Sequence, residues 1–101
     1  MFKNMDQILK QAQAMQEKLK QELDGMTVEG SSGGGMVTVQ MTGNKVITSV
    51  KIDPEVVDRH DVEMLQDLIA AAVNETARKV DEETQRRVGS LAGGIKIPGL
   101  F

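Results

Sequence analysis

Basic and amide side chains recur along the first 21 residues at the spacing of one helical face. On a helical wheel they fall opposite a stripe of apolar residues. Lysine attracts phosphate through its charge, and amides hydrogen-bond to phosphates or to base edges. The pattern suits a polyanion, although the residues by themselves favour a plain solvated face with an ion pair between Asp6 and Lys10. The polar face consists of Lys3, Gln7, Lys10, Lys18 and Gln21.

A second group of cations lies in a later helical segment that is acidic overall. Residues 61–88 contain four basic and seven acidic residues, whereas the first 24 residues contain four of each. Carboxylates four residues away from these cations predict ion pairs along the helix, so the group is expected to neutralise itself. The cations are Arg78, Lys79, Arg86 and Arg87, and the predicted pairs are Glu75–Lys79, Lys79–Glu83, Glu82–Arg86 and Glu83–Arg87.

Residues that could support catalysis or hold a metal ion are sparse. The chain has no cysteine, and His60 is its only histidine. A general base or a metal site needs partner groups, and the nearby Asp58 and Asp61 are better explained as candidate caps of the following helix. The glycines at 33–35 enter a strand and lack the Gly-Lys-Ser/Thr sequence of a phosphate-binding loop. We therefore expect no enzyme, no metal and no cofactor.

The composition is typical of a small single-domain protein. Only two of the 101 residues are aromatic, so the core must be built from aliphatic side chains. A net charge of −3 argues against a strongly basic nucleic-acid binder. No apolar run approaches the roughly 20 residues that span a bilayer, and the N-terminus lacks the apolar core of a secretory signal. These features predict a cytoplasmic protein without a membrane partner.

Periodicity predicts one domain, residues 1–101, of the α+β class with the order α-β-β-β-α in two layers. Apolar residues three and four apart predict two long helices, and apolar–polar alternation predicts three antiparallel strands. The predicted elements are a helix at about 2–24, strands at about 26–30, 36–42 and 45–53, a helix at about 61–88 and a flexible tail at 89–101.

A hairpin joins the second and third predicted strands. Gly43 and Asn44 are a two-residue turn signal between two alternating runs. With these residues as the loop, the odd-numbered positions form one mostly apolar face that must be covered by the helices. The predicted cross-strand pairs on this face are Met41–Val46, Val39–Thr48 and Val37–Val50.

The two predicted helices have more apolar surface than one small sheet can cover. The first half of the second helix is apolar nearly all round, which indicates burial on more than one side. The first helix, roughly 35 Å long, exceeds a hairpin of ~17–20 Å and should project beyond the sheet. We therefore expect a homodimer, with an interface that includes Leu65, Leu68, Ile69, Ala72 and Val73.

The ordered set of segments resembles the YbaB/EbfC family of small bacterial nucleoid-associated proteins. The resemblance covers nearly the whole length, and it rests on the set rather than on one motif. The matching segments are Met5–Ala12, Gly33–Val39, Val50–Pro54, Leu65–Asn74 and the closing Gly93-Gly94 to Pro98-Gly99-Leu100.

This resemblance implies a tweezer-like homodimer with projecting helices that binds double-stranded DNA without catalysis. Many relatives have a lysine in the strand after the glycines, whereas Thr38 and Gln40 stand there in this chain. The resemblance therefore assigns no phosphate contact to that strand. By position, the implied DNA-binding residues are Lys3, Gln7, Lys10, Lys18, Arg78, Lys79, Arg86 and Arg87.

We therefore expect a nucleoid-associated protein that binds duplex DNA as a dimer with low sequence specificity. Binding would alter DNA conformation and so affect nucleoid organisation and gene expression. The alternative is a scaffold for a protein partner in DNA replication or repair. The amphipathic first helix and the methionine stripe of Met5, Met15 and Met26 would bind such a partner, since methionine surfaces adapt to several partners.

Overall fold

The computed structural model of the chain describes residues 2–91. It confirms the predicted α+β class and the order helix, three strands, helix. The second helix was predicted to end at residue 88, three residues too early, and the rest of the predicted tail lies outside the described residues. The elements are α1 (Phe2–Gly25), β1 (Thr27–Ser32), β2 (Val37–Thr42), β3 (Ile47–Ile52), the short 3-10 helix η1 (Pro54–Val56) and α2 (Val62–Leu91).

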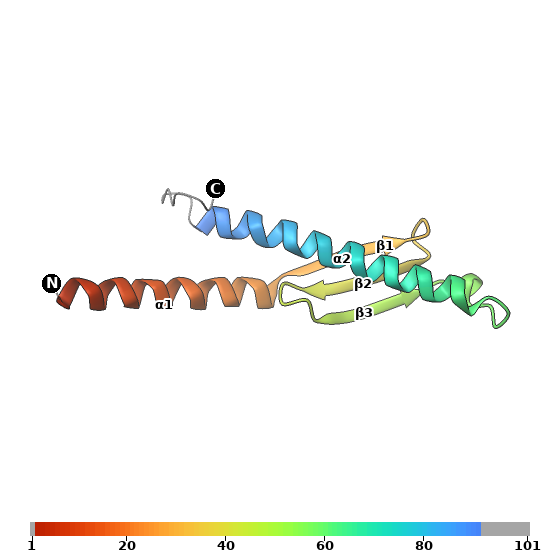
Figure 1. The fold of residues 1–101 in the computed structure, drawn as a ribbon, viewed down its shortest axis with the longest axis horizontal. Helices are drawn as coiled ribbons and strands as arrows, with labels where there is room; N and C mark the ends of the chain where they lie inside the picture. Colours follow the sequence, from red (N-terminus) through yellow and green to blue (C-terminus); the bar gives the residue numbers. More distant parts are fainter. Residues whose placement is uncertain (1, 92–101) are drawn as a thin grey trace.

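The three strands form one antiparallel sheet in the order β1-β2-β3, and α2 lies over β1 and β2 (Figure 1). Along β2, alternate side chains are buried, and Val37, Val39 and Met41 face the helix. Ala72 and Val80 of α2 belong to the same buried cluster. Burial of one such aliphatic side chain contributes about 1.5–3 kcal/mol to the free energy of unfolding. The contact between α2 and the sheet is therefore the hydrophobic core of the subunit.

The close approach of α2 to β1 depends on Gly30 and Thr76. A Cβ atom on Gly30 would lie 2.8 Å from the backbone nitrogen of Thr76, closer than real side chains come. Thr76 is fully buried, and its hydroxyl donates a hydrogen bond of 2.7 Å to the Ala72 carbonyl, so its donor is satisfied. Glycine weakens a strand by itself, and here the packing of the helix requires it.

The register of the β2–β3 hairpin differs from the prediction. Val37 lies opposite Ile52 instead of Val50, a shift of two residues. Because the shift is even, Val37 and Val39 keep their predicted face. The observed pairs are Val37–Ile52, Thr38–Lys51, Val39–Val50, Gln40–Ser49 and, past an unpaired Thr48 in β3, Met41–Ile47.

The connection between β2 and β3 explains one residue of this shift, and an irregularity in β3 explains the other. The Lys45 amide donates to the Thr42 carbonyl at 3.0 Å, and Lys45 itself adopts a left-handed conformation with φ of 62°. The Thr42 amide then donates to the Val46 carbonyl at 2.9 Å. This tight turn and its left-handed residue make a loop of three residues, one more than predicted, and so move Met41 from Val46 to Ile47. The unpaired Thr48 in β3 adds the second residue of the shift.

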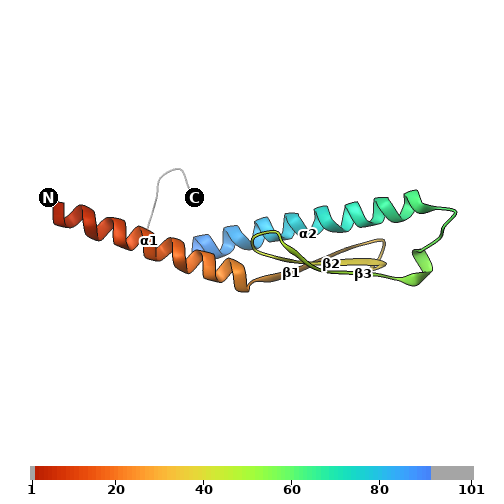
Figure 2. The same ribbon diagram turned by 90° about the horizontal axis from the view of Figure 1, so that it is seen from below.

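Helix α1 extends away from the sheet and makes the molecule long and narrow, with dimensions of 70 × 22 × 16 Å (Figure 2). Residues 4–18 of α1 are exposed, whereas Leu19, Glu22 and Leu23 are partly buried. The last part of α2 runs back beside the end of α1 in the opposite direction (Figures 1 and 2). The first helix therefore projects beyond the sheet, as its length predicted.

Candidate nucleic-acid interface

The predicted polar face of α1 lies on the projecting part of the helix. Gln7, Lys10 and Lys18 are exposed there, and Lys3 belongs to the first turn of the same helix. Among the ion pairs of the described residues, none involves Lys10 or Lys18, and the predicted pair between Asp6 and Lys10 is not formed. These ammonium groups are thus open to an incoming anion.

An open lysine on a projecting helix is well suited to phosphate. Binding to a DNA phosphate releases condensed counterions, and no internal ion pair has to be broken first. The glutamines of the same face add hydrogen-bond donors and acceptors without charge. The arrangement therefore favours attraction to the backbone of a nucleic acid over the readout of particular bases.

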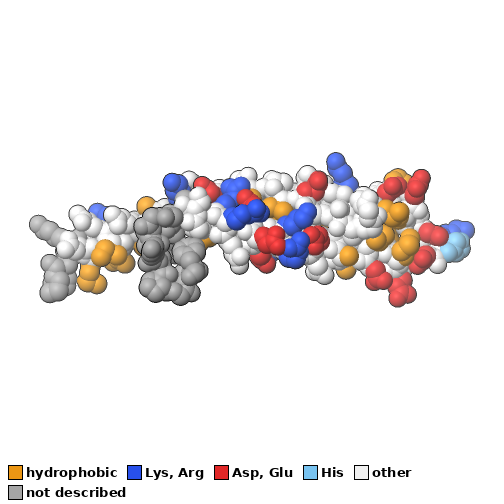
Figure 3. Space-filling view, turned by 90° about the horizontal axis from the view of Figure 1, so that it is seen from above, with side chains coloured by type: hydrophobic (Ala, Val, Ile, Leu, Met, Phe, Trp, Pro, Cys, Tyr) orange, Lys and Arg blue, Asp and Glu red, His pale blue; other side chains and the backbone are white. Residues whose placement is uncertain are grey.

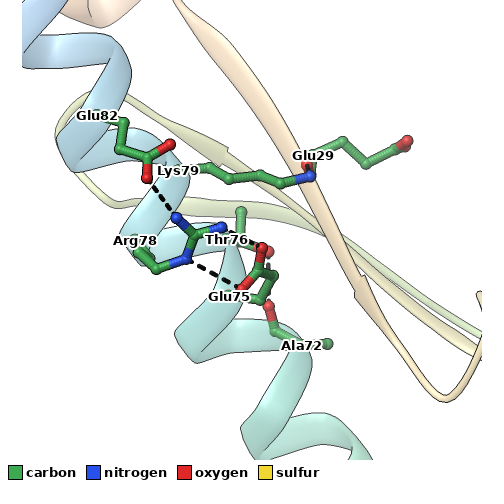
Figure 4. A network of polar contacts seen from close by, with 7 residues as sticks. All are labelled: Glu29, Ala72, Glu75, Thr76, Arg78, Lys79 and Glu82. Carbon is green, nitrogen blue, oxygen red and sulfur yellow. Dashed lines mark hydrogen bonds and ion pairs between the residues drawn. The ribbon is translucent and has the colours of Figure 1, made fainter.

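The cations of α2 are engaged within the subunit, as Figure 4 shows for Arg78. Arg78 donates to both carboxylate oxygens of Glu75, at 2.6 and 3.2 Å, and it also pairs with Glu82. The hydrogen bond from Arg78 lowers the pKa of Glu75, and the same bond raises the pKa of Arg78. Because these side chains are exposed, the network contributes little to stability, but it occupies the guanidinium.

The side chain of Lys79 points toward the sheet and does not run along the surface of α2. Its Nζ donates a hydrogen bond of 3.2 Å to the carbonyl oxygen of Glu29 in β1 (Figure 4). This contact joins the helix to the edge strand of the sheet. Lys79 therefore has a structural partner outside its own helix, which the sequence pattern did not predict.

Arg86 and Arg87 share the carboxylate of Glu83. Arg86 Nη2 lies 2.7 Å from Oε2 of Glu83, and Arg87 Nε lies 3.3 Å from Oε1. Arg87 also approaches Glu22 of α1, at 3.6 Å. The structure thus brings Arg87, of the second cation group, to the base of α1. Beside it lies a cleft of about 300 Å³ lined by Met26, Thr27, Val28, Lys79, Glu82, Glu83, Arg86 and Arg87.

Three of the four predicted ion pairs in α2 are therefore wrong. All six residues of these pairs lie within the described residues, and only the pair between Glu83 and Arg87 is formed. The other acids were assigned to the wrong cations, because Glu75 and Glu82 both pair with Arg78. Spacings of three and four residues are equivalent on a helix surface, so spacing alone leaves the choice of partner open.

The end of the molecule that carries η1 and the start of α2 is acidic (Figure 3). Asp61 caps α2, because its Oδ1 accepts a hydrogen bond of 3.2 Å from the Met64 amide. Asp58 instead accepts from the His60 amide at 2.9 Å in the preceding turn. Over residues 2–91, no three histidine or acidic side chains are placed to hold a metal ion. This end repels a polyanion, and it lies far from the exposed part of α1.

The triple glycine, Gly33–Gly35, forms the turn between β1 and β2. Its three φ angles are 59°, 68° and 95°, in the left-handed region that favours glycine. The turn leads from strand to strand, so it does not present the start of a helix to a phosphate, as a phosphate-binding loop does. The glycines act as a connection in the sheet.

Apolar side chains remain uncovered beside the core. On β3, Ile47 and Val50 are 45% and 44% exposed, because α2 lies over the other two strands. Among the predicted interface residues of α2, Leu65, Leu68, Ile69 and Val73 are only partly buried. Ala72, in contrast, is 0% exposed in the subunit's own core, so it offers no surface to a second copy.

Three polar residues with structural contacts were absent from the predicted site. Asn44 contacts Asp24, Lys45 contacts Asp81, and Glu22 contacts Arg87. Each partner lies at least 20 residues away in the chain, so neither periodicity nor local charge spacing could indicate these contacts.

In the part of the chain that the structure describes, neither helix is apolar enough over its length to cross a membrane.

The chain is similar to known proteins over nearly its whole length. The chain is 54% identical to a nucleoid-associated protein of Acetivibrio thermocellus, over 97% of this chain and 90% of that protein. It is 50% identical to a nucleoid-associated protein of Alkaliphilus metalliredigens, over 97% and 89% of the two chains.

A solved structure shows the same fold. An uncharacterized protein from Helicobacter pylori aligns with a TM-score of 0.78 over 92% of this chain and 98% of that chain, at 22% identity. A profile of the YbaB/EbfC DNA-binding family matches residues 1–95. This match and the close relatives confirm the resemblance seen in the sequence, and the chain belongs to the YbaB/EbfC DNA-binding family.

Proposed function

We propose that this protein binds double-stranded DNA in the bacterial nucleoid, with low sequence specificity and without catalysis. Its family and the names of its relatives support DNA binding in the cytoplasmic nucleoid. The single observation that carries the proposal is the open lysine face of the projecting α1, with Gln7, Lys10 and Lys18 exposed. We extend the proposal to an altered DNA conformation, and through it to nucleoid organisation and gene expression.

Low specificity follows from the kind of contact. Lysine–phosphate contacts fix a protein on the duplex, but they carry no sequence information. The exposed cations on α1 are few and the net charge of the chain is −3, so affinity should be modest and should depend on salt. In the second group, Arg78, Lys79, Arg86 and Arg87 contribute less in this proposal, because each already has a partner within the subunit.

The proposal includes a homodimer. The uncovered apolar residues of β3 lie on the sheet face that α2 occupies, and α2 adds four half-buried apolar residues, Leu65, Leu68, Ile69 and Val73. A second copy placed here would cover Val50 and would protect the open edge of β3 from other strands. Two copies also present two α1 helices to one duplex, so that the second contact forms at a high effective concentration.

The proposed surface is tested by a salt series of DNA-binding measurements. The variant Lys10→Gln/Lys18→Gln removes two open charges from α1. Each lost phosphate contact lowers the salt slope by about 0.9, so binding at moderate salt should weaken roughly tenfold or more. The control, Lys51→Gln/Arg59→Gln, removes the same charge from exposed positions outside α1. Equal losses in both variants would reject α1 as the contact surface.

A second candidate function rests on the apolar side of the same helix. Met5 and Ile8 are 59% and 62% exposed, which suits a scaffold that binds a protein of DNA replication or repair. Capture of partners from a lysate, repeated after nuclease treatment, separates the two functions. Partners lost after nuclease favour DNA binding, and partners retained favour the scaffold.

A further inference from the structure

Three consecutive residues in the turn between β2 and β3 contact both long helices. The Gly43 amide donates a hydrogen bond of 3.0 Å to the Leu23 carbonyl, in the last turn of α1. The Asn44 side-chain amide donates to the carboxylate of Asp24. Lys45 Nζ lies 2.8 Å from the carboxylate of Asp81, in the middle of α2. One short turn is thus tied to the end of the first helix and to the second.

The contact with α1 is tight at Gly43. A Cβ atom there would lie 2.7 Å from the carbonyl oxygen of Leu23 and 2.8 Å from its Cα, so a larger residue would push the helix and the turn apart. Gly25, two residues beyond Leu23, has nothing within 4 Å of such an atom. The two glycines of this joint therefore differ, since Gly43 is packed against the backbone of α1 and Gly25 has open space around it.

Few other contacts fix the direction of α1. Residues 4–18 are exposed, and the ion pair between Glu22 and Arg87 joins side chains that are themselves more than one third exposed. The helix between Leu23 and Gln7 is about 24 Å long by its rise per residue, so a rotation of about 10° at the joint moves Gln7 by about 4 Å. Successive phosphates of one DNA strand are about 3.4 Å apart along the axis. A small change at the turn therefore shifts Lys10 by about one phosphate, and Lys18, which is nearer the joint, by less.

We propose that the turn Gly43–Lys45 is a bracket that sets the angle of α1 to the sheet and to α2. By this means it positions Lys10 and Lys18 for DNA, a consequence that rests on the proposed function. A turn that only closed the hairpin would need no contact with either helix. Lys45 also adopts its left-handed conformation without being glycine, and its exposed side chain contacts Asp81 of α2 from there.

The bracket can be broken and restored by exchanging two side chains. Asn44→Asp places a second carboxylate against Asp24, and Asp24→Asn/Asn44→Asp recreates an amide–carboxylate pair with the roles exchanged. The double variant has the net charge of the natural chain. Asn74→Asp, at an exposed position of α2, adds the same charge as Asn44→Asp away from the turn. In addition, Gly43→Ala is compared with Gly25→Ala, and circular dichroism checks that each variant folds.

The angle of α1 is measured directly by spin-label distances, because the chain has no cysteine of its own. Labels on Gln13→Cys in α1 and Ser31→Cys in β1 report it, with excess unlabelled chain so that each assembly contains one labelled copy. We expect Asn44→Asp and Gly43→Ala to shift or broaden the distance by several ångströms. The exchanged pair should restore it, and the two controls should leave it unchanged.

DNA affinity at one fixed salt concentration completes the test. It should fall about tenfold in Asn44→Asp, by the loss of aligned phosphate contacts, and recover in the exchanged pair. Unchanged distances in both Asn44→Asp and Gly43→Ala overturn the bracket, whatever the DNA result. Changed distances with unchanged affinity overturn its role in positioning. If the natural chain binds no DNA, the proposed function fails, while the distances still decide whether the turn sets the angle.

Discussion

The guanidinium of Arg87 lies 3.6 Å from the carboxylate of Glu22, where α2 meets the base of the projecting α1. The same arginine also bonds to Glu83 of its own helix at 3.3 Å. A cation held by two acids is less available to a phosphate than a free lysine, because an existing pair must first be broken. This contact assigns Arg87 to the junction of the helices.

Replacement of Arg87 by glutamine should therefore affect DNA binding less than Lys10→Gln. Because both partners of the pair are partly exposed, we expect the free energy of unfolding to change by only about 0–1 kcal/mol. Urea denaturation of Glu22→Gln, Arg87→Gln and the double variant isolates the coupling. A loss of DNA affinity in Arg87→Gln larger than that in Lys10→Gln would return this residue to the DNA surface.

The ion pair between Arg78 and Glu75 gives stability a dependence on pH. Hydrogen bonding from Arg78 lowers the pKa of Glu75 in the folded chain below its ordinary value of 4.5. The corresponding stabilisation is fully present above 4.5, and it is lost as the pH falls through the folded value. In Arg78→Gln, NMR titration should show the pKa of Glu75 returning toward 4.5. A Glu75 titration that is the same in both proteins would show that the pair is not formed in solution.

Gly30→Ala should destabilise the subunit. The new methyl group would meet the backbone of Thr76, which cannot move without shifting α2. Overpacking of this kind costs about 1–3 kcal/mol, measured by urea denaturation. Gly25→Ala, which has open space around it, serves as the control and should change stability by less than about 1 kcal/mol. Equal effects of the two substitutions would contradict the close approach of helix and strand.

Val50→Lys should separate the proposed dimer. Val50 lies on the helix-facing side of β3 and is not covered by its own subunit, so a charge there affects association before it affects the fold. Equilibrium sedimentation should show one chain for Val50→Lys and two for the natural protein. Val57→Lys introduces the same charge at an exposed position outside the sheet and should remain dimeric. A natural protein that sediments as one chain at micromolar concentration would refute the dimer.

Local patterns predicted the elements well, because helix and strand periodicities are properties of neighbouring residues. The stripe of α1 and the alternation in β2 identified both elements, but only the apolar face of β2 is buried in the subunit. The hairpin register failed by two residues, since neither the left-handed Lys45 that lengthens the loop nor the unpaired Thr48 in β3 is a recognised turn signal in the way that glycine is. The end of α2 was also misplaced, because Gly89 continues the helix instead of ending it.

The candidate site was predictable only where it depends on one element. The exposed face of α1 follows from the spacing of Gln7, Lys10 and Lys18 along a single helix. The partners of the α2 cations depend instead on contacts between elements, such as Lys79 with the Glu29 carbonyl. The burial of Ala72 likewise depends on which side of α2 meets the sheet. The spacing of residues predicts which side chains share a face of one helix, but contacts between elements determine which of them stay exposed.

The acidic end of the molecule has a consequence for the moment before contact. Carboxylates at one pole of a 70 Å rod, with α1 at the other, give the protein a charge asymmetry along its length. The electric field of DNA exerts a torque on this charge distribution and turns the acidic end away from the duplex before the surfaces touch. A chain with an unfavourable net charge can thus approach a duplex with α1 leading. The orientation of the encounter is set by the distribution of charge and not by its sum.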